Sequence, residues 1–445
     1  MKKTLIKNAF VVNEGETKQM DVLIEAGKIA QIKESIAADD QTEIVEAEGK
    51  YLLPGLIDDQ VHFREPGLTH KACIRTESRA AVAGGITSFI EMPNTNPQTT
   101  TREELDRKFA IADQDALANY SFMFGGTNDN FEEIKNLDTT QVAGLKLFLG
   151  SSTGNMLVDN EEVLRKIFSS TDLVISVHCE DEPTIRKNLA DHIEEYGDDI
   201  PIDKHPVIRS HEACYLSSSR AIALAKETGA RLHVFHLSTA IETDLFDNSI
   251  PLAEKKITAE VCTHHLWFTA DDYAEKGTFI KWNPAVKNTE DREALWAALN
   301  DDRIDVLATD HAPHTLEEKQ NPYTKAPSGG PLVQHALLAL LTASKQGKIS
   351  LEKLVEKACH NPAILFQIAE RGYVREGYYA DLVLVDLNQQ TTVKKEDLLY
   401  QCGWSPFEGT TFDATVEKTW VNGSMVYDQG KIIETNAAKR LQFNR

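Results

Sequence analysis

The chain has 445 residues, of which 41% are hydrophobic and 26% are charged, and its formal net charge is −22. This composition supports a folded core and excludes general disorder. The excess of 69 acidic over 47 basic residues repels nucleic acid and anionic membrane surfaces, so we expect a small-molecule substrate, no nucleic acid and no membrane.

The sequence also lacks targeting features. No stretch approaches about 18 consecutive apolar residues, the length that a transmembrane helix needs. The chain starts with two lysines after Met1, but no long apolar run follows, which argues against a secretory signal. The six cysteines form no CxxC pair, which indicates reduced thiols and a cytoplasmic protein.

The first part of the chain has a β-type pattern. Short runs at residues 5–12, 21–25 and 28–33 are separated by the turns Glu14-Gly15 and Ala26-Gly27. We expect these runs to form short strands.

From residue 54 to residue 371, apolar runs alternate with amphipathic segments. The apolar runs are residues 55–61, 87–91, 120–124, 144–148, 173–177, 232–235, 258–262 and 305–308. The amphipathic segments include residues 76–83, 161–169, 212–228 and 291–299. Eight buried strands that alternate with helices predict an α/β fold, a (β/α)8 TIM barrel, over residues 54–371.

The β pattern returns near Tyr373, with runs at residues 380–385, 414–421 and 424–427. We therefore expect both chain ends, residues 1–53 plus 372–445, to form one small β-sandwich domain beside the barrel.

Polar side chains stand at or near the carboxyl ends of the predicted barrel strands, where barrel enzymes place their chemistry. They are His62, Lys146, His178, His236 and Asp310. A single histidine at a strand end is more often structural than a ligand. Because several strands show the same feature, we favour a site for a divalent metal such as zinc.

Lys146 stands inside an apolar strand. A lysine there usually lies at a sheet edge and extends to water, but an inner barrel strand makes that difficult. Burial lowers the pKa of a lysine toward that of a neutral amine. A neutral amine can add carbon dioxide, and the resulting carbamate can bridge two metals.

Longer motifs accompany these residues. The first is Pro54-Gly55-Leu56-Ile57-Asp58, followed by His62-Phe63-Arg64-Glu65-Pro66-Gly67. Others are Met92-Pro93-Asn94-Thr95, Lys146-Leu147-Phe148, His178-Cys179-Glu180, His233-Val234-Phe235-His236-Leu237-Ser238, Asn283-Pro284, Ala308-Thr309-Asp310-His311-Ala312-Pro313-His314 and Glu376-Gly377-Tyr378-Tyr379-Ala380-Asp381-Leu382-Val383. With these motifs the chain resembles the cyclic-amidohydrolase branch of the amidohydrolase superfamily. Within that branch it is similar to the dihydroorotases, because allantoinase-like relatives differ at Arg64 and Asn94.

The resemblance implies a metal-binding role for six residues. His62 and Gln60 would bind the more buried metal, while His178 and His236 would bind the second. Lys146, as a carbamate derived from CO2, would bridge them, and Asp310 would bind metal and act as general base. The implied cofactor is Zn2+, one or two ions per chain. The implied reaction is the reversible cyclisation of N-carbamoyl-L-aspartate to L-dihydroorotate in de novo pyrimidine biosynthesis, in which a metal-bound hydroxide is the nucleophile of the hydrolytic direction.

The resemblance also implies a substrate-binding group. Arg64 would form a bidentate pair with the substrate carboxylate, and Asn94 and His314 would complete this clamp. The remaining contacts to the ring would come from Asn283, Ser328 and Gly329. A homo-oligomer is expected for the family. Considered alone, each of these residues also has a structural interpretation. Arg64 could form an ion pair with its neighbour Glu65, and Asn94 could begin a turn.

Two departures from the family pattern stand out. The family usually has His-x-His on strand one, whereas this chain has Gln60 at the first position. An amide oxygen is a poorer zinc ligand than imidazole, so we expect the site with His62 to be weak, altered or empty. The loop 328–335 also lacks the usual Glu-Thr pair.

Three functions stay open at this point. The first is a zinc-dependent dihydroorotase. The second is another cyclic amidohydrolase of the hydantoinase or allantoinase kind, against which Arg64 and Asn94 weigh. The third is a non-catalytic dihydroorotase-like subunit that supports a transcarbamoylase. Only Gln60 favours that third function, because it stands where the family has a metal ligand and a scaffold needs none. The presence of Lys146, His178, His236 and Asp310 weighs against it. We interpret the remaining histidines as structural, packing or surface residues.

Overall fold

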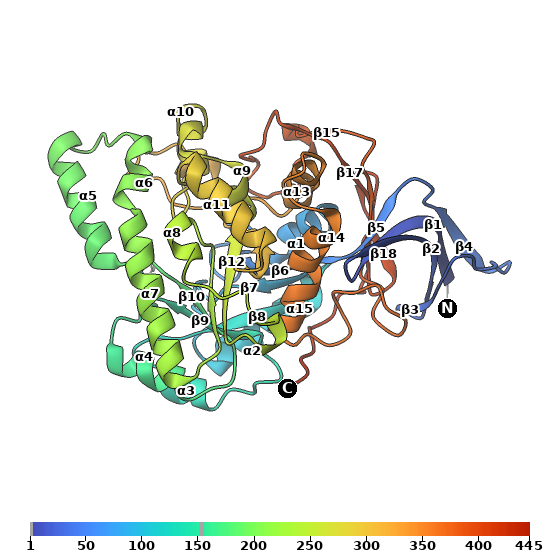
Figure 1. Cartoon of the computed structure of the whole chain (residues 1–445), viewed down its shortest axis with the longest axis horizontal. Helices are drawn as coiled ribbons and strands as arrows, with labels where there is room; N and C mark the ends of the chain where they lie inside the picture. Colours follow the sequence, from blue (N-terminus) through green and yellow to red (C-terminus); the bar gives the residue numbers. More distant parts are fainter. Residues whose placement is uncertain (1–2, 151–154) are drawn as a thin grey trace.

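The predicted apolar runs form eight parallel strands of one sheet (Figure 1). The computed structural model describes residues 3–150 and 155–445. The strands are β6 (Leu56–Val61), β7 (Ile86–Glu91), β8 (Asn119–Gly125), β9 (Gly144–Phe148), β10 (Ile175–His178), β11 (Leu232–Val234), β12 (Ile257–Cys262) and β13 (Val306–Ala308). They are paired in chain order from β6 to β13. A parallel bridge between Val61 and His311 joins the first strand to the segment after the last, so the sheet closes and the predicted TIM barrel is confirmed.

The barrel strands are buried along almost their whole length. Every residue of β7, β8, β9 and β10 is buried. Strands of a parallel sheet that are covered on both faces consist of continuous apolar runs rather than alternating ones, which explains why these runs were visible in the sequence.

Helices cover the outside of the barrel. They are α1 (Ile74–Ala83), α2 (Arg102–Asp115), α3 (Phe131–Lys135), α4 (Glu161–Phe168), α5 (Glu182–Tyr196), α6 (His205–Ile208), α7 (His211–Thr228), α8 (Ala240–Thr243), α9 (Thr263–Trp267), α10 (Tyr273–Lys276), α11 (Thr289–Asn300), α12 (Leu316–Lys319), α13 (Ala336–Lys345), α14 (Leu351–Val355) and α15 (Asn361–Leu365). Several start at a side-chain cap. Thr101 caps α2, Asp181 caps α5 and Ser210 caps α7, each by accepting a backbone N–H of the first turn.

Both chain ends contribute to a second sheet, at the right of Figure 1. Its strands are β1 (Lys3–Asn13), β2 (Glu16–Glu25), β3 (Lys28–Lys33), β4 (Thr42–Glu46), β5 (Tyr51–Pro54), β14 (Leu382–Asp386), β17 (Thr415–Val421), β18 (Ser424–Asp428) and β19 (Lys431–Ile432). β5 joins the two ends, because it pairs in parallel with β1 and antiparallel with β14. β15 (Thr391–Thr392) and β16 (Thr411–Phe412) form a separate two-stranded sheet.

The last residues of the chain return to the barrel. The N–H of Tyr120 in β8 donates to Lys439 O at 3.1 Å, and the N–H of Leu441 donates to Tyr120 O at 2.8 Å. Leu441 and Phe443 are buried there. This segment therefore covers the amino-terminal end of the barrel, opposite the strand ends that carry the polar side chains.

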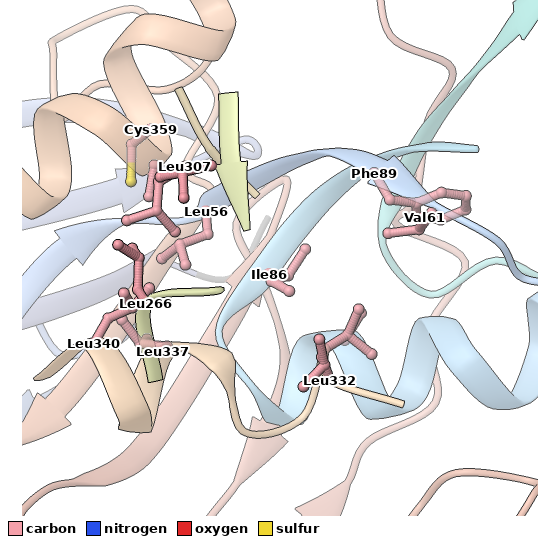
Figure 2. Close-up of a cluster of buried hydrophobic side chains, with 14 of the residues drawn as sticks. Leu56, Val61, Ile86, Phe89, Leu266, Leu307, Leu332, Leu337, Leu340 and Cys359 are labelled. Atoms are coloured by element: carbon pink, nitrogen blue, oxygen red, sulfur yellow. The ribbon is translucent and has the colours of Figure 1, made fainter. Parts of the chain in front are cut away.

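A core of buried aliphatic side chains lies between the barrel strands and the helices around them (Figure 2). Leu56, Ile86 and Leu307 come from strands, while Leu337 and Leu340 come from α13. Burying one such side chain stabilises the fold by about 1.5–3 kcal/mol. In the described part of the chain, no helix is long and apolar enough to cross a membrane.

Candidate active site

A cavity of about 690 Å³ opens at the carboxyl ends of the barrel strands. All of the predicted site residues line it: Gln60, His62, Arg64, Asn94, Lys146, His178, His236, Asn283, Asp310, His314, Ser328 and Gly329. They come from segments up to about 270 residues apart, from Gln60 to Gly329. Barrel closure therefore brings together the whole predicted set.

His62 faces Asp310 across the first and last strands. The Nδ1–H of His62 donates to Asn94 Oδ1 at 2.8 Å, which leaves the Nε2 lone pair 3.2 Å from Asp310 Oδ1. Burial lowers the pKa of His62 well below its usual range and raises the pKa of Asp310 to about 7. A neutral imidazole nitrogen next to a carboxylate oxygen is a suitable pair of ligands for a cation.

His178 and His236 form a second pair. His178 Nε2–H donates to Glu180 Oε2 at 2.8 Å, and His178 Nδ1 lies 3.0 Å from His236 Nε2. Burial opposes the charge of Glu180, but Arg209 and His178 lower its pKa to about 2. An ionised carboxylate that accepts one ring N–H fixes the tautomer of the histidine and keeps the other nitrogen available for a metal.

Lys146 also lines the cavity and is 1% exposed. Its Nζ lies 4.1 Å from the ring centroid of Phe235 and has no hydrogen-bond acceptor in residues 3–150 and 155–445. Burial lowers the pKa of Lys146 to about 7. An amine that has no hydrogen-bond acceptor and is roughly half neutral at pH 7 fits the predicted carbamate. The added carboxylate would both remove the buried cation and supply oxygen ligands.

Gln60 occupies the position of the missing first histidine. Its Oε1 accepts a weak hydrogen bond from Cys262 Sγ at 3.6 Å. The pairing of β6 with β7 shifts register between Asp58 and Val61. Because such a bulge breaks the alternation of a strand, the adjacent Asp59 and Gln60 both enter the barrel interior.

Arg64 is a buried cation that lines the cavity. Its Nε donates to Pro313 O at 3.0 Å, and its Nη2 lies 3.0 Å from His314 Nε2. It forms no ion pair with Glu65, whose carboxylate accepts the N–H of Ile74 at 2.9 Å. Burial lowers the pKa of Arg64 to about 10, so the guanidinium stays charged at neutral pH. Within the described residues, this charge has no carboxylate partner.

Three site residues have a left-handed backbone: φ is 70° at Arg64, 40° at His236 and 50° at Asp310. Residues other than glycine rarely adopt this backbone region, and the strain that it causes is concentrated at functional sites. Each residue stands two or three positions after the end of a barrel strand, and its side chain lines the cavity.

The sequence did not single out several residues that complete the site. Glu180 orients His178, and Lys71 Nζ donates to His314 Nδ1 at 3.0 Å. Trp282 lines the cavity and stacks on His264, with ring centroids 4.4 Å apart. Glu180 stands two residues after a predicted ligand, which was a usable signal. Lys71 and Trp282 had none, because only the closed barrel brings them to the site.

A separate group lies inside the barrel. One ligand atom each of Asp59, His233 and Glu260, all buried, lies within 4.8 Å of the others, a geometry that can hold a metal ion. Burial opposes the charge of His233, but the two carboxylates raise its pKa to about 9. The imidazolium therefore already compensates negative charge there. This group shares no residue with the predicted ligand set.

Comparisons with known proteins relate the chain to one family. Residues 51–426 match the family model described as "Amidohydrolase family". A dihydroorotase of Halobacterium salinarum is 37% identical over 393 residues, which are 86% of this chain and 88% of the relative. A dihydroorotase of Carboxydothermus hydrogenoformans is 35% identical over 437 residues, 96% of this chain and 98% of the relative.

Relatives with other names are also similar. An allantoinase of Desulfitobacterium hafniense is 30% identical over 448 residues, which are 98% of each chain. Among solved structures, an L-hydantoinase (dihydropyrimidinase) from Arthrobacter aurescens has a TM-score of 0.94 at 28% identity, covering 99% of this chain and 100% of the other. The barrel and the second sheet are therefore shared across cyclic amide hydrolases.

Proposed function

The chain belongs to the amidohydrolase family, and we propose that it is a dihydroorotase, which interconverts N-carbamoyl-L-aspartate and L-dihydroorotate. One observation carries this proposal: the buried guanidinium of Arg64 faces the cavity without a carboxylate partner among the described residues. A ring substrate that bears a carboxylate supplies the missing anion. The similarity to dihydroorotases over most of the chain supports the same reading.

We propose that the site holds zinc. Gln60, His62 and Asp310 would hold one ion, His178 and His236 the other, and Lys146 as its carbamate would lie between them. Two features support this assignment. Lys146 Nζ is buried without a hydrogen bond in the described part of the chain, and His178 Nδ1 and His236 Nε2 lie 3.0 Å apart. When bound, zinc polarises an amide carbonyl and lowers the pKa of water.

The residues of the chain would bind the substrate in one orientation. Arg64 forms a charged hydrogen bond with the ring carboxylate. Asn94 is held by the Nδ1–H of His62 and presents its NH2 group to the same carboxylate. Asn283, Ser328 and Gly329 line the same cavity and would contact the ring.

Asp310 would carry the proton. Its Oδ1 faces His62, and we assign the proton to Oδ2. In the hydrolytic direction Oδ2 accepts the proton of the attacking water and gives it to the ring nitrogen as the amide bond breaks. In the cyclising direction, Oδ2 takes the proton from the carbamoyl nitrogen as that nitrogen attacks the side-chain carboxyl carbon, and gives it to the hydroxyl that leaves this carbon as water. A carboxylate whose pKa is raised toward neutrality suits both steps.

Turnover measured on L-dihydroorotate, hydantoin and allantoin, with zinc content determined on the same sample, tests the proposal. We expect turnover of dihydroorotate together with bound zinc. Turnover of hydantoin or allantoin alone would identify another cyclic amidohydrolase, and no turnover at all would favour a non-catalytic subunit. A homo-oligomer in the cytoplasm, as expected for the family, completes the proposal.

A further inference from the structure

A buried lysine lies directly behind one wall of the cavity. Lys319, the last residue of α12, is 0% exposed. Its Nζ donates to Gly329 O at 2.8 Å, to Pro327 O at 2.9 Å and more weakly to Lys281 O at 3.4 Å. Among the described residues it forms no ion pair, since the neighbouring Glu318 pairs with Lys71 at 2.9 Å. Three backbone carbonyls therefore hold this amino group.

These contacts orient the backbone of residues 327–329, which we call the substrate wall because all three line the cavity. In a trans peptide, C=O and N–H point in opposite directions. With Pro327 O turned toward Lys319, the N–H of Ser328 points away from it. In the described part of the chain, no backbone or side-chain acceptor takes this N–H.

The substrate wall lies beside the cation that binds the carboxylate. His314 Nε2 lies 3.0 Å from Ser328 O and 3.0 Å from Arg64 Nη2. Gly329 has φ of 125°, and a Cβ there would meet Ala312 O at 2.5 Å. The wall is thus in close contact with the segment after β13, and its position depends on what lies behind it.

A second lysine supports the same wall. Lys281 is 7% exposed, and its Nζ donates to Tyr323 O and Ala326 O, each at 2.6 Å. Its own carbonyl accepts the N–H of Gly329 at 2.8 Å. Hydrogen bonds to backbone carbonyls offset the cost of burying these two amino groups, and they hold the wall from behind.

We propose that Lys319 is a positioning residue for the substrate carboxylate, which it serves by turning the N–H of Ser328 toward the anionic end of the ring. This inference rests on the proposed function, since it requires a substrate with a carboxylate. Lys319 itself touches no substrate atom. It orients the wall, and it thereby favours a carboxylated ring over the same ring without the carboxylate.

The test compares Lys319→Met with the wild type on L-dihydroorotate and on dihydrouracil, the ring that lacks the carboxylate. We expect the KM for dihydroorotate to rise at least tenfold, roughly the loss of one charged hydrogen bond. We expect much smaller changes in kcat and zinc content, and little change in affinity for dihydrouracil measured as competition. Lys325→Met is the matched control, because Lys325 is an exposed lysine of the same loop and its loss should leave both KM values unchanged.

Other outcomes would overturn the inference. If Lys319→Met keeps the wild-type KM for dihydroorotate, the wall does not need the amino group behind it. An equal loss for both rings, or an equal loss in Lys325→Met, would show a general effect of folding or charge. If Lys319→Met does not fold, Gly329→Ala displaces the wall from the other side and must raise the KM for dihydroorotate. A wild type that does not turn over dihydroorotate at all would refute the proposed function, and this inference with it.

Discussion

Replacing Lys146 by Met should remove zinc and activity together. The structure places the amine of Lys146 in a fully buried position where its pKa is lowered to about 7. At pH 7, roughly half of such amines are neutral, against about one in 2,500 for a lysine with the usual pKa of about 10.4. The amine that can react with carbon dioxide is therefore enriched on the order of a thousandfold. Lys146→Met keeps a side chain of similar length but cannot form the bridging anion.

Zinc per chain from elemental analysis and turnover of dihydroorotate are the two measurements. A 13C-labelled bicarbonate supply would give a carbamate carbon signal in the wild type and none in the variant. Lys146→Arg is the matched control for charge, because an arginine stays protonated and cannot become a carbamate. Short carboxylic acids with excess zinc should partly restore Lys146→Ala, whose smaller side chain leaves room for them. Full zinc content and normal turnover in Lys146→Met, or an unmodified amine in fully active wild type, would refute the reasoning.

Substitutions at three further positions test the other assignments. Asp310→Asn should abolish turnover and leave the fold intact, because an amide cannot accept the proton; near-normal kcat at saturating substrate would contradict this role. Arg64→Met should raise the KM for dihydroorotate at least tenfold, since a charged hydrogen bond contributes about 1.5–3 kcal/mol, with little change in zinc content. Equal affinity in wild type and variant would mean that the carboxylate binds elsewhere. Gln60→His should tighten metal binding at the site with His62, because imidazole is a better zinc ligand than an amide, and Gln60→Ala should weaken it. Chelator titration followed by elemental analysis measures this, and a wild type that already retains two zinc ions as firmly as Gln60→His would show that the glutamine is no deficit.

Much of the barrel could be predicted from local pattern. A strand covered on both faces consists of one continuous apolar run, so the predicted 144–148 and the observed Gly144–Phe148 are the same residues. Amphipathic spacing and caps are local in the same way, and the predicted helix 212–228 is observed as His211–Thr228 with Ser210 as its cap. Polar residues at the strand ends then predicted the centre of the site, because all carboxyl ends of parallel strands meet on one face. They are His62, Lys146, His178, His236 and Asp310.

Pairing over long separations could not be predicted in this way. β4 and β5 are short and were not predicted, and β5 is a strand because β1 and β14 lie on either side of it. The docking of the last residues on β8 likewise depends on Tyr120 and Leu441, about 320 residues apart, being brought together. Hydrophobic periodicity describes one segment at a time and contains no information on its partner.

The sequence by itself determined which residue types stand at the strand ends, and with them the class of chemistry. Only the tertiary structure decided their electrostatic state. The pKa of Lys146 falls to about 7 because a closed barrel removes water from its amine. Arg64 faces the cavity unpaired because Glu65 turns away to cap α1. The contacts of Lys319 with the wall of the cavity also exist only after closure. Burial and long-range proximity are properties of the folded chain, so no local pattern could reveal them.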